Sequence, residues 1–243
     1  MPEQLWFTAL LNRLFAGPVT ALLEALHISP QYPQAPISNA VAMELVVFLF
    51  LVVLFLLARR RLSVDNPGAL QHIFEGAHGF IVDQSHEIIG HHGGDFAPFL
   101  TSLGLFILSC NLLGLIPSLD SPTATPVVPL GCAICAFVYY QAQGFKRNGV
   151  GYLKHFLGPV WWLAWLMLPI ELISHLARML SLTIRLFANM FAGDMVTLVF
   201  FSLVPLVFPV VFLGLHFFVA LLQTYIFVLL TMVYLQGAVA EEH

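Results

Sequence analysis

Polar and charged side chains recur at helical spacing inside one of the most apolar stretches of this sequence. They are Glu171, His175, Arg178, Arg185 and Asn189. At about 100° per residue, these positions stay within roughly 40° of one line along a helix. A charged side chain at the centre of a bilayer costs roughly 2.5–3.5 kcal/mol. A stripe of this kind is therefore too costly to be incidental, and it is typical of a path for protons or ions.

A second apolar stretch, nearer the C-terminus, carries His216 and Gln223 on one helical face with Phe227 and Tyr234. If the two stretches form an antiparallel hairpin, residue numbers that face each other have a nearly constant sum. His216 is then expected to meet Asp194, and Gln223 to meet Asn189 near Arg185. Asp194 lies roughly 140° around the helix from Glu171, so it faces a different neighbour from the stripe.

The hairpin would gather two polar groups of side chains. One group contains Asp194 and His216, and the other contains Glu171, Ser174, His175 and Arg178. Arg185 stands between them, about 10 Å along the helix axis from Arg178 and about 13 Å from Asp194.

Asp, Glu and His side chains can relay protons, whereas an arginine stays charged and passes no proton on. The pattern thus predicts two half-paths separated by a fixed cation, because a continuous pore would dissipate an ion gradient. No carboxylate of this chain is an evident partner for Arg185, so we expect the acid to come from another subunit.

Composition places the chain in the membrane. Of its 243 residues, 59% are hydrophobic and 9% are charged, and the mean hydropathy is +0.90. Soluble domains have about 25% charged residues. The net charge of −4 comes without a basic patch, so no nucleic-acid partner is indicated. The three cysteines lie in apolar segments, where packing is favoured over metal or redox chemistry, and no cofactor or metal site is predicted.

We predict an all-α integral membrane protein with about five membrane-crossing helices, a single domain over residues 1–243. Its parts are an N-terminal interfacial segment (1–40), a helical membrane region (41–155) and a long helical hairpin carrying the ion path (156–243). The expected crossings are residues 41–58, 96–116, 127–142, 160–202 and 210–239. The second and third of these are expected to pair as a hairpin, because their connection is short. Residues 67–95 have the spacing of an amphipathic helix lying on the membrane surface.

The crossing at 160–202 is unusually long. At 1.5 Å per residue it would exceed about 60 Å, roughly twice the hydrocarbon core. It must therefore tilt strongly, lie partly in the membrane or break near Pro169. The N-terminal segment is expected to be retained, because it lacks the basic start of a signal peptide and Arg13 interrupts its apolar part.

Histidines gather around residues 86–95, where His86, His91, His92 and Asp95 could form a metal or pH-sensing site. No helical pair of ligands with a third ligand is evident, so solvated histidines at the headgroup level are favoured.

The distribution of basic residues predicts the orientation. Six of the nine fall in loops that five crossings place on one side: Arg59, Arg60, Arg61, Lys146, Arg147 and Lys154. The positive-inside rule then puts the N-terminus outside and the C-terminus in the cytoplasm.

Several segments together resemble the membrane-embedded a subunit of bacterial F-type ATP synthases. They are ELISHLARMLS from Glu171, SLTIRLFANMFAGD at 181–194, LHFFVALLQTYIFVLLTMVYL at 215–235 and NLLGLIP at 111–117. The resemblance extends from Glu44 to the C-terminus and implies a non-catalytic, proton-translocating subunit in the bacterial inner membrane. It also implies the c-ring, peripheral-stalk b subunits and other ATP synthase subunits as partners.

The resemblance assigns roles to matching positions. Arg185 matches the stator arginine that faces the carboxylates of the c-ring. The polar residues of the outer half-channel correspond to Asn189, Asp194, His216 and Gln223, and the cytoplasmic side corresponds to Glu171, Ser174 and Arg178. The chain departs from the family at Asp194, where glutamate is usual, and at Pro126 and Pro129, where an Asn-containing helix start is expected.

Two other classes of function are compatible with intramembrane histidines. A membrane cytochrome could use His175 and His216 as axial haem ligands, although Arg185 and Asn189 would then have no role. A secondary transporter would be expected to have an internal repeat, and none is evident in the sequence.

Overall fold

The computed structural model describes residues 5–25, 27, 35–59, 62–63, 68–90, 92–116, 119, 121–149, 152, 164–203 and 208–239. Its helices are α1 (Trp6–Ala25), α2 (Asn39–Arg59), α3 (Ala69–Ile89), α4 (Ala97–Leu113), α5 (Val127–Asn148), α7 (Ala164–Leu203) and α8 (Phe208–Val239). Two short 3-10 turns, η1 (Gly93–Asp95) and η2 (Pro122–Ala124), lie before α4 and α5. The described part contains no strand, which confirms the predicted all-α fold.

Five of these helices are long and apolar enough to cross a membrane: α1, α2, α5, α7 and α8. The number agrees with the prediction, but the set differs in two members. The N-terminal helix α1 qualifies, although it was expected to be interfacial. Helix α4 is apolar but has only 17 residues, because it ends at Leu113, before the predicted boundary at residue 116.

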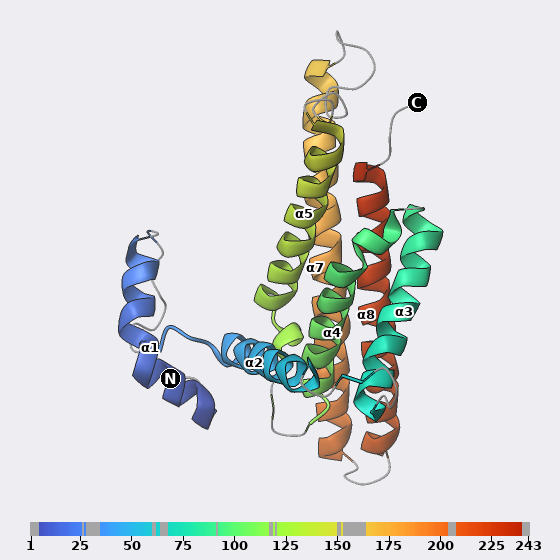
Figure 1. Ribbon diagram of the computed structural model, residues 1–243. Helices are drawn as coiled ribbons and strands as arrows, with labels where there is room; N and C mark the ends of the chain where they lie inside the picture. The colour runs from blue at the N-terminus through green and yellow to red at the C-terminus, as the bar shows by residue number, and fades with distance from the viewer. Residues whose placement is uncertain are drawn as a thin grey trace.

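Helices α4, α5, α7 and α8 form the main bundle, and α7 and α8 run side by side as the predicted antiparallel hairpin (Figure 1). Helix α8 packs against α4, α5 and α7. Helices α4 and α5 are antiparallel, as expected, and the rings of Phe99 and Tyr139 stack 3.7 Å apart between them. Each of them nevertheless packs more extensively on α8 than on the other.

Helix α7 continues without a break through Pro169. Pro169 is the sixth residue of the helix, so it removes one backbone hydrogen bond just after the first turn without ending the helix. At 40 residues, α7 is about 60 Å long. A break at Pro169 is therefore excluded, and a strong tilt or a partly in-plane course remains for this helix.

Helix α3 follows the main bundle, whereas α2 runs across it (Figure 1). The Tyr225 hydroxyl donates to the Gln84 side chain at 3.2 Å, and the rings of Phe80 and Tyr225 lie 5.8 Å apart, so α3 packs on α8. If α2 stands upright in the bilayer, α3, α7 and α8 lie strongly tilted. The surface position of α3 stays a prediction.

The N-terminal helix contacts the rest of the chain mainly through α2. The Asn12 side chain donates to the carbonyl of Ile37 and accepts from its N–H, both at 3.0 Å. The remainder of α1 stands apart from the bundle (Figure 1).

The core that fixes the long hairpin is built from small residues facing large ones. Ala133 and Ala136 of α5 and Ala220 of α8 are buried against Leu186 and Met190 of α7. Small side chains let helix backbones approach closely, and this is how membrane helices gain packing energy.

Several residues used in the sequence predictions lie outside the described part of the chain. They are Arg60, Arg61, His91 and Lys154, together with the C-terminal residues 240–243. The division of the chain into three parts likewise stays a prediction.

Candidate functional site

The two long helices face each other in the predicted register. Asp194 lies opposite His216, with 3.7 Å between Oδ1 and Nδ1. One and a half turns along, Asn189 Nδ2 donates to Gln223 Oε1 at 2.7 Å. The step away from the first contact is five residues on α7, from Asp194 to Asn189, and seven on α8, from His216 to Gln223. Both predicted contacts are present.

The cluster of Asp194 and His216 lies near the looped end of the hairpin. The His216 side chain is 2% exposed and that of Asp194 is 24% exposed. Neither ring nitrogen of His216 has a hydrogen-bond partner among the described residues. Buried polar atoms almost always find a partner, so this ring is placed to exchange hydrogen bonds with water or with the Asp194 carboxylate.

The Asn189–Gln223 pair continues the polar line toward the middle of the hairpin. Gln223 is buried, and its Nε2 has no partner within the described chain. Its Oε1 is held by Asn189. The free amide donor is therefore available to a water molecule or to an acceptor that approaches from outside this chain.

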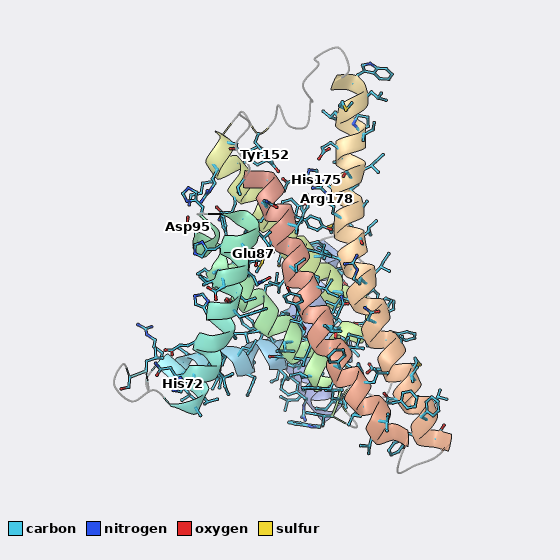
Figure 2. The ribbon with its side chains drawn as sticks, turned by 90° about the vertical axis from the view of Figure 1, so that its right-hand side faces the viewer. His72, Glu87, Asp95, Tyr152, His175 and Arg178 are labelled. Carbon is cyan, nitrogen blue, oxygen red and sulfur yellow. The ribbon has the colours of Figure 1, made fainter. Side chains whose placement is uncertain are left out.

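The second cluster lies about 20 residues further along α7. His175 is buried, and its Nε2 lies 3.3 Å from Glu171 Oε1. On the other side of the ring, Nδ1 lies 3.1 Å from the Tyr140 hydroxyl of α5. The guanidinium of Arg178 lies over the Tyr234 ring, 5.5 Å from its centroid. Figure 2 labels His175, Arg178 and Tyr152 near the same end of the α7–α8 hairpin.

These side chains line a cavity of about 160 Å³. The cavity lies between α5, α7 and α8, and its lining residues are Tyr140, Tyr152, Glu171, His175, Arg178, Tyr234, Gly237 and Ala238. Its volume would hold several water molecules. Ser174, which the sequence grouped with this cluster, is half-buried on α7 and does not line the cavity.

Arg185 stands between the two clusters, as predicted. Its Nη2 lies 3.5 Å from the Ser181 hydroxyl, and the residue is half-buried. No carboxylate in the described ranges comes within 4.0 Å of its guanidinium. The face of α7 beside it is apolar and exposed, with Ile184 at 59% and Phe191 at 43%. Among the described residues, Arg185 therefore has no acid beside it, and the exposed apolar face next to it is open to a neighbouring protein.

Two residues of the second cluster were missed by the sequence reasoning: Tyr140 and Tyr152. Tyr140 belongs to an apolar helix and resembles ordinary core packing in the sequence. Tyr152 lies just beyond α5, where its ring rests on Gly144 and its hydroxyl donates to Gln141. Burial, and to a smaller extent Glu171, raises the pKa of Tyr152, and nearby Arg178 opposes the rise. The phenol therefore stays neutral.

The geometry does not support a haem held by His175 and His216. His175 belongs to the Tyr140 cluster and His216 to the Asp194 cluster. Along the hairpin these clusters are about 30 Å apart, by the rise of 1.5 Å per residue. The two rings cannot ligate one iron.

The histidines near residue 90 make local contacts. His92 Nδ1 lies 3.6 Å from Asp95, which also accepts a bond from Arg147 at 3.1 Å. His86 Nδ1 lies 3.4 Å from the Gly90 carbonyl. Within the described residues, no group of three or more His, Cys, Asp or Glu side chains could hold a metal.

Comparison with known proteins places this arrangement in a family. The ATP synthase A chain family matches residues 40–236, which is most of the chain. The chain belongs to the ATP synthase subunit a family.

Curated members of the subunit a family resemble the chain over nearly its whole length. The ATP synthase subunit a of Koribacter versatilis is 59% identical over 244 residues, covering 100% of both chains. That of Solibacter usitatus is 52% identical over 233 residues, covering 96% of this chain and 99% of the relative. ATP synthase subunit a 1 of Pelobacter propionicus is 40% identical over 222 residues, covering 91% and 94%.

Both clusters and Arg185 lie inside the part of the chain that matches the subunit a family. Helix α1 precedes it. Membership in this family favours a proton-translocating stator over the haem-binding and secondary-transporter alternatives.

Proposed function

We propose that this chain is the non-catalytic stator subunit of a rotary F-type ATP synthase, with two offset proton half-paths separated by Arg185. The observation that carries the proposal is the position of Arg185. It is a permanent cation at an exposed apolar face, between two titratable clusters, with no acid of the described chain beside it. The partner that fits this position is a ring of subunits that each bring one carboxylate through the membrane.

The outer half-path uses the Asp194 cluster. A proton reaches the Asp194 carboxylate and the His216 ring, which lie 3.7 Å apart. It then passes the Asn189–Gln223 pair, whose amides can orient water toward the neighbouring ring. A carboxylate of the c-ring that takes up this proton becomes neutral and can turn into lipid.

The cytoplasmic half-path uses the cavity at Glu171 and His175. A protonated ring carboxylate that arrives on this side releases its proton toward water in the cavity, which Glu171, His175 and Arg178 line. Ser174 lies beside this route on α7, and we assign its hydroxyl to the route.

Arg185 makes the two paths a coupled system. An arginine side chain does not give up its proton, so it cannot relay one between the clusters. Its charge favours the ionised form of each passing carboxylate, which obliges the ring to unload before it reloads. A direct leak would waste about 2.3 kcal/mol per charge for each 100 mV of membrane potential.

The partners and the orientation follow from this role. The chain is an integral protein of a bacterial membrane, assigned here to the inner membrane together with the c-ring, the peripheral-stalk b subunits and the other ATP synthase subunits. The C-terminus is placed in the cytoplasm by the basic loops. We assign the N-terminus to the outside by the same rule, from the five crossings expected in the sequence.

Replacement of Arg185 by alanine tests the proposal. In membrane vesicles containing the assembled complex, Arg185→Ala is expected to abolish ATP synthesis and ATP-driven proton pumping and to allow passive proton leak through the membrane sector. Arg13→Ala, on the exposed face of α1, is the matched control and retains both activities. Synthesis at the normal rate in Arg185→Ala would rule the assignment out.

A further inference from the structure

On the side that faces away from Glu171, the His175 ring meets the hydroxyl of Tyr140. The Tyr140 oxygen lies 3.1 Å from His175 Nδ1, and Tyr140 is 2% exposed. The Tyr140 and His175 rings lie nearly parallel, with 6.0 Å between centroids and 25° between planes. Phe137 meets the same imidazole edge-on at 6.0 Å. The ring of His175 is therefore fixed from α5 in one orientation.

That orientation presents the two ring nitrogens to different partners. Nε2 faces the Glu171 carboxylate at 3.3 Å, and Nδ1 faces the Tyr140 hydroxyl. A carboxylate accepts hydrogen bonds, so Nε2 carries a hydrogen in both protonation states of the ring. The proton that the ring gains or loses is the one on Nδ1, at the Tyr140 side.

A hydroxyl suits this position because it can both donate and accept. When His175 is neutral, Tyr140 donates to Nδ1, and when His175 is protonated, Tyr140 accepts from Nδ1. Tyr140 also lines the cavity. Its oxygen can receive a proton from water there and pass its own to Nδ1, which leaves the tyrosine unchanged.

We infer that Tyr140 is a positioning residue for the cytoplasmic half-path, which holds His175 with Nε2 toward Glu171 and links Nδ1 to the water of the cavity. The inference rests on the proposed function. Among the described residues, the charged and titratable groups that face His175 are Glu171 and Arg178 from α7, Tyr140 from α5, Tyr234 from α8 and Tyr152 beyond α5. Of the groups in this cavity, a histidine is the one whose ordinary pKa lies near neutrality. The rate of proton transfer through the half-path is therefore expected to change with pH near neutrality, which gives one limb of its pH profile.

The test compares two adjacent tyrosines of α5. Tyr140→Phe keeps the ring and removes the hydroxyl, and it is expected to slow ATP-driven proton pumping by between about twofold and tenfold, the effect of one hydrogen bond. Tyr139→Phe is the control, because Tyr139 stacks on Phe99 of α4 instead, and it keeps the wild-type rate. Both are measured in inverted vesicles at equal amounts of assembled complex.

A positioning role is separated from a merely structural one by two further readouts. His175→Leu is expected to remove one limb of the pH profile of pumping, and Tyr140→Phe is expected to have no additional effect in that background. Incorporation of 3,5-difluorotyrosine at position 140 keeps the ring and the hydroxyl but makes the phenol a weaker acceptor. It favours neutral His175 and is expected to move the same limb to lower pH.

The inference is overturned if Tyr140→Phe pumps at the wild-type rate, if its effect persists undiminished in the His175→Leu background, or if fluorination leaves the pH profile in place. Its failure is distinguishable from failure of the proposed function, because the latter is judged by Arg185→Ala and its proton leak. Neither Tyr140 nor His175 replacement is expected to produce such a leak.

Discussion

The imidazole ring of His216 lies directly against the backbone of Gly193 on the facing helix. A β-carbon added at Gly193 would lie 2.8 Å from both Cδ2 and Nε2 of that ring. Real side chains do not approach so closely, and the ring is buried with little room to move. Glycine at position 193 therefore gives His216 the space in which it meets Asp194.

Gly193→Ala is expected to push the His216 ring away from Asp194 and to slow proton uptake. Loss of one polar contact in the proton path is worth about 0.5–1.5 kcal/mol, so we expect up to roughly a tenfold loss of ATP-driven pumping. The measurement is dye quenching in inverted vesicles normalised to assembled complex. Gly131→Ala, on α5 with nothing within 4 Å of the added carbon, is the control. Unchanged pumping in Gly193→Ala would contradict the role given to this contact.

Asp194 supplies the carboxylate of the outer cluster, so Asp194→Asn is expected to slow proton flux about tenfold or more, without the passive leak of Arg185→Ala. General acid–base groups typically contribute a factor of 10²–10⁴, and water can replace part of it. Asp194→Glu is expected to retain function, since one more methylene can span the 3.7 Å gap to His216. Flux equal to wild type in Asp194→Asn would remove this residue from the path.

The Asn189–Gln223 hydrogen bond predicts a coupling between the two long helices. Asn189→Ala, Gln223→Ala and the double variant form a cycle, and we expect a coupling energy of about 0.5–1.5 kcal/mol in the rate of pumping. Asn12, which bonds to Ile37 near the N-terminus, provides the comparison. Asn189→Ala and Asn12→Ala are expected to be additive, whereas additivity of the first pair would show that the 2.7 Å contact is not used.

Gly144 has a corresponding role in the second cluster. A β-carbon there would lie 2.8 Å from two carbons of the Tyr152 ring and 3.1 Å from the Ala238 carbonyl. Gly144→Ala is expected to displace Tyr152 and destabilise the subunit by about 1–3 kcal/mol. The temperature at which the solubilised complex aggregates measures the effect, with Gly131→Ala as the reference. Equal temperatures for the two variants would show that Tyr152 does not depend on this contact.

The register of the hairpin could be predicted because polar side chains in apolar helices have few possible partners. Asp194 and Asn189 are polar groups at the right spacing on the facing helix for His216 and Gln223 to lie against, so the pairing follows from residue types and spacing. Both contacts are present, as expected where unpaired polar groups in a low-dielectric environment are costly.

The parts that could not be predicted depend on contacts between segments that share no period. Tyr140 has the sequence signature of a packed aromatic residue, and its partner His175 lies on a different helix. The position of Tyr152 depends on Gly144, which the sequence presents as one helical glycine among several. Residues 6–25 were expected to be interfacial because Arg13 interrupts their apolar part, whereas the helix they form is long and apolar enough to cross a membrane.

Both clusters and Arg185 are carried in part by one uninterrupted helix, α7. Insertion or removal of a single residue between Arg178 and Asp194 would rotate one end of this rod by about 100° relative to the other and shift it by about 1.5 Å. Arg185 and one of the clusters would then face different surroundings. The number of residues along α7 thus sets the distances between Glu171, Arg185 and Asp194. We expect this segment to tolerate substitutions far better than changes in length.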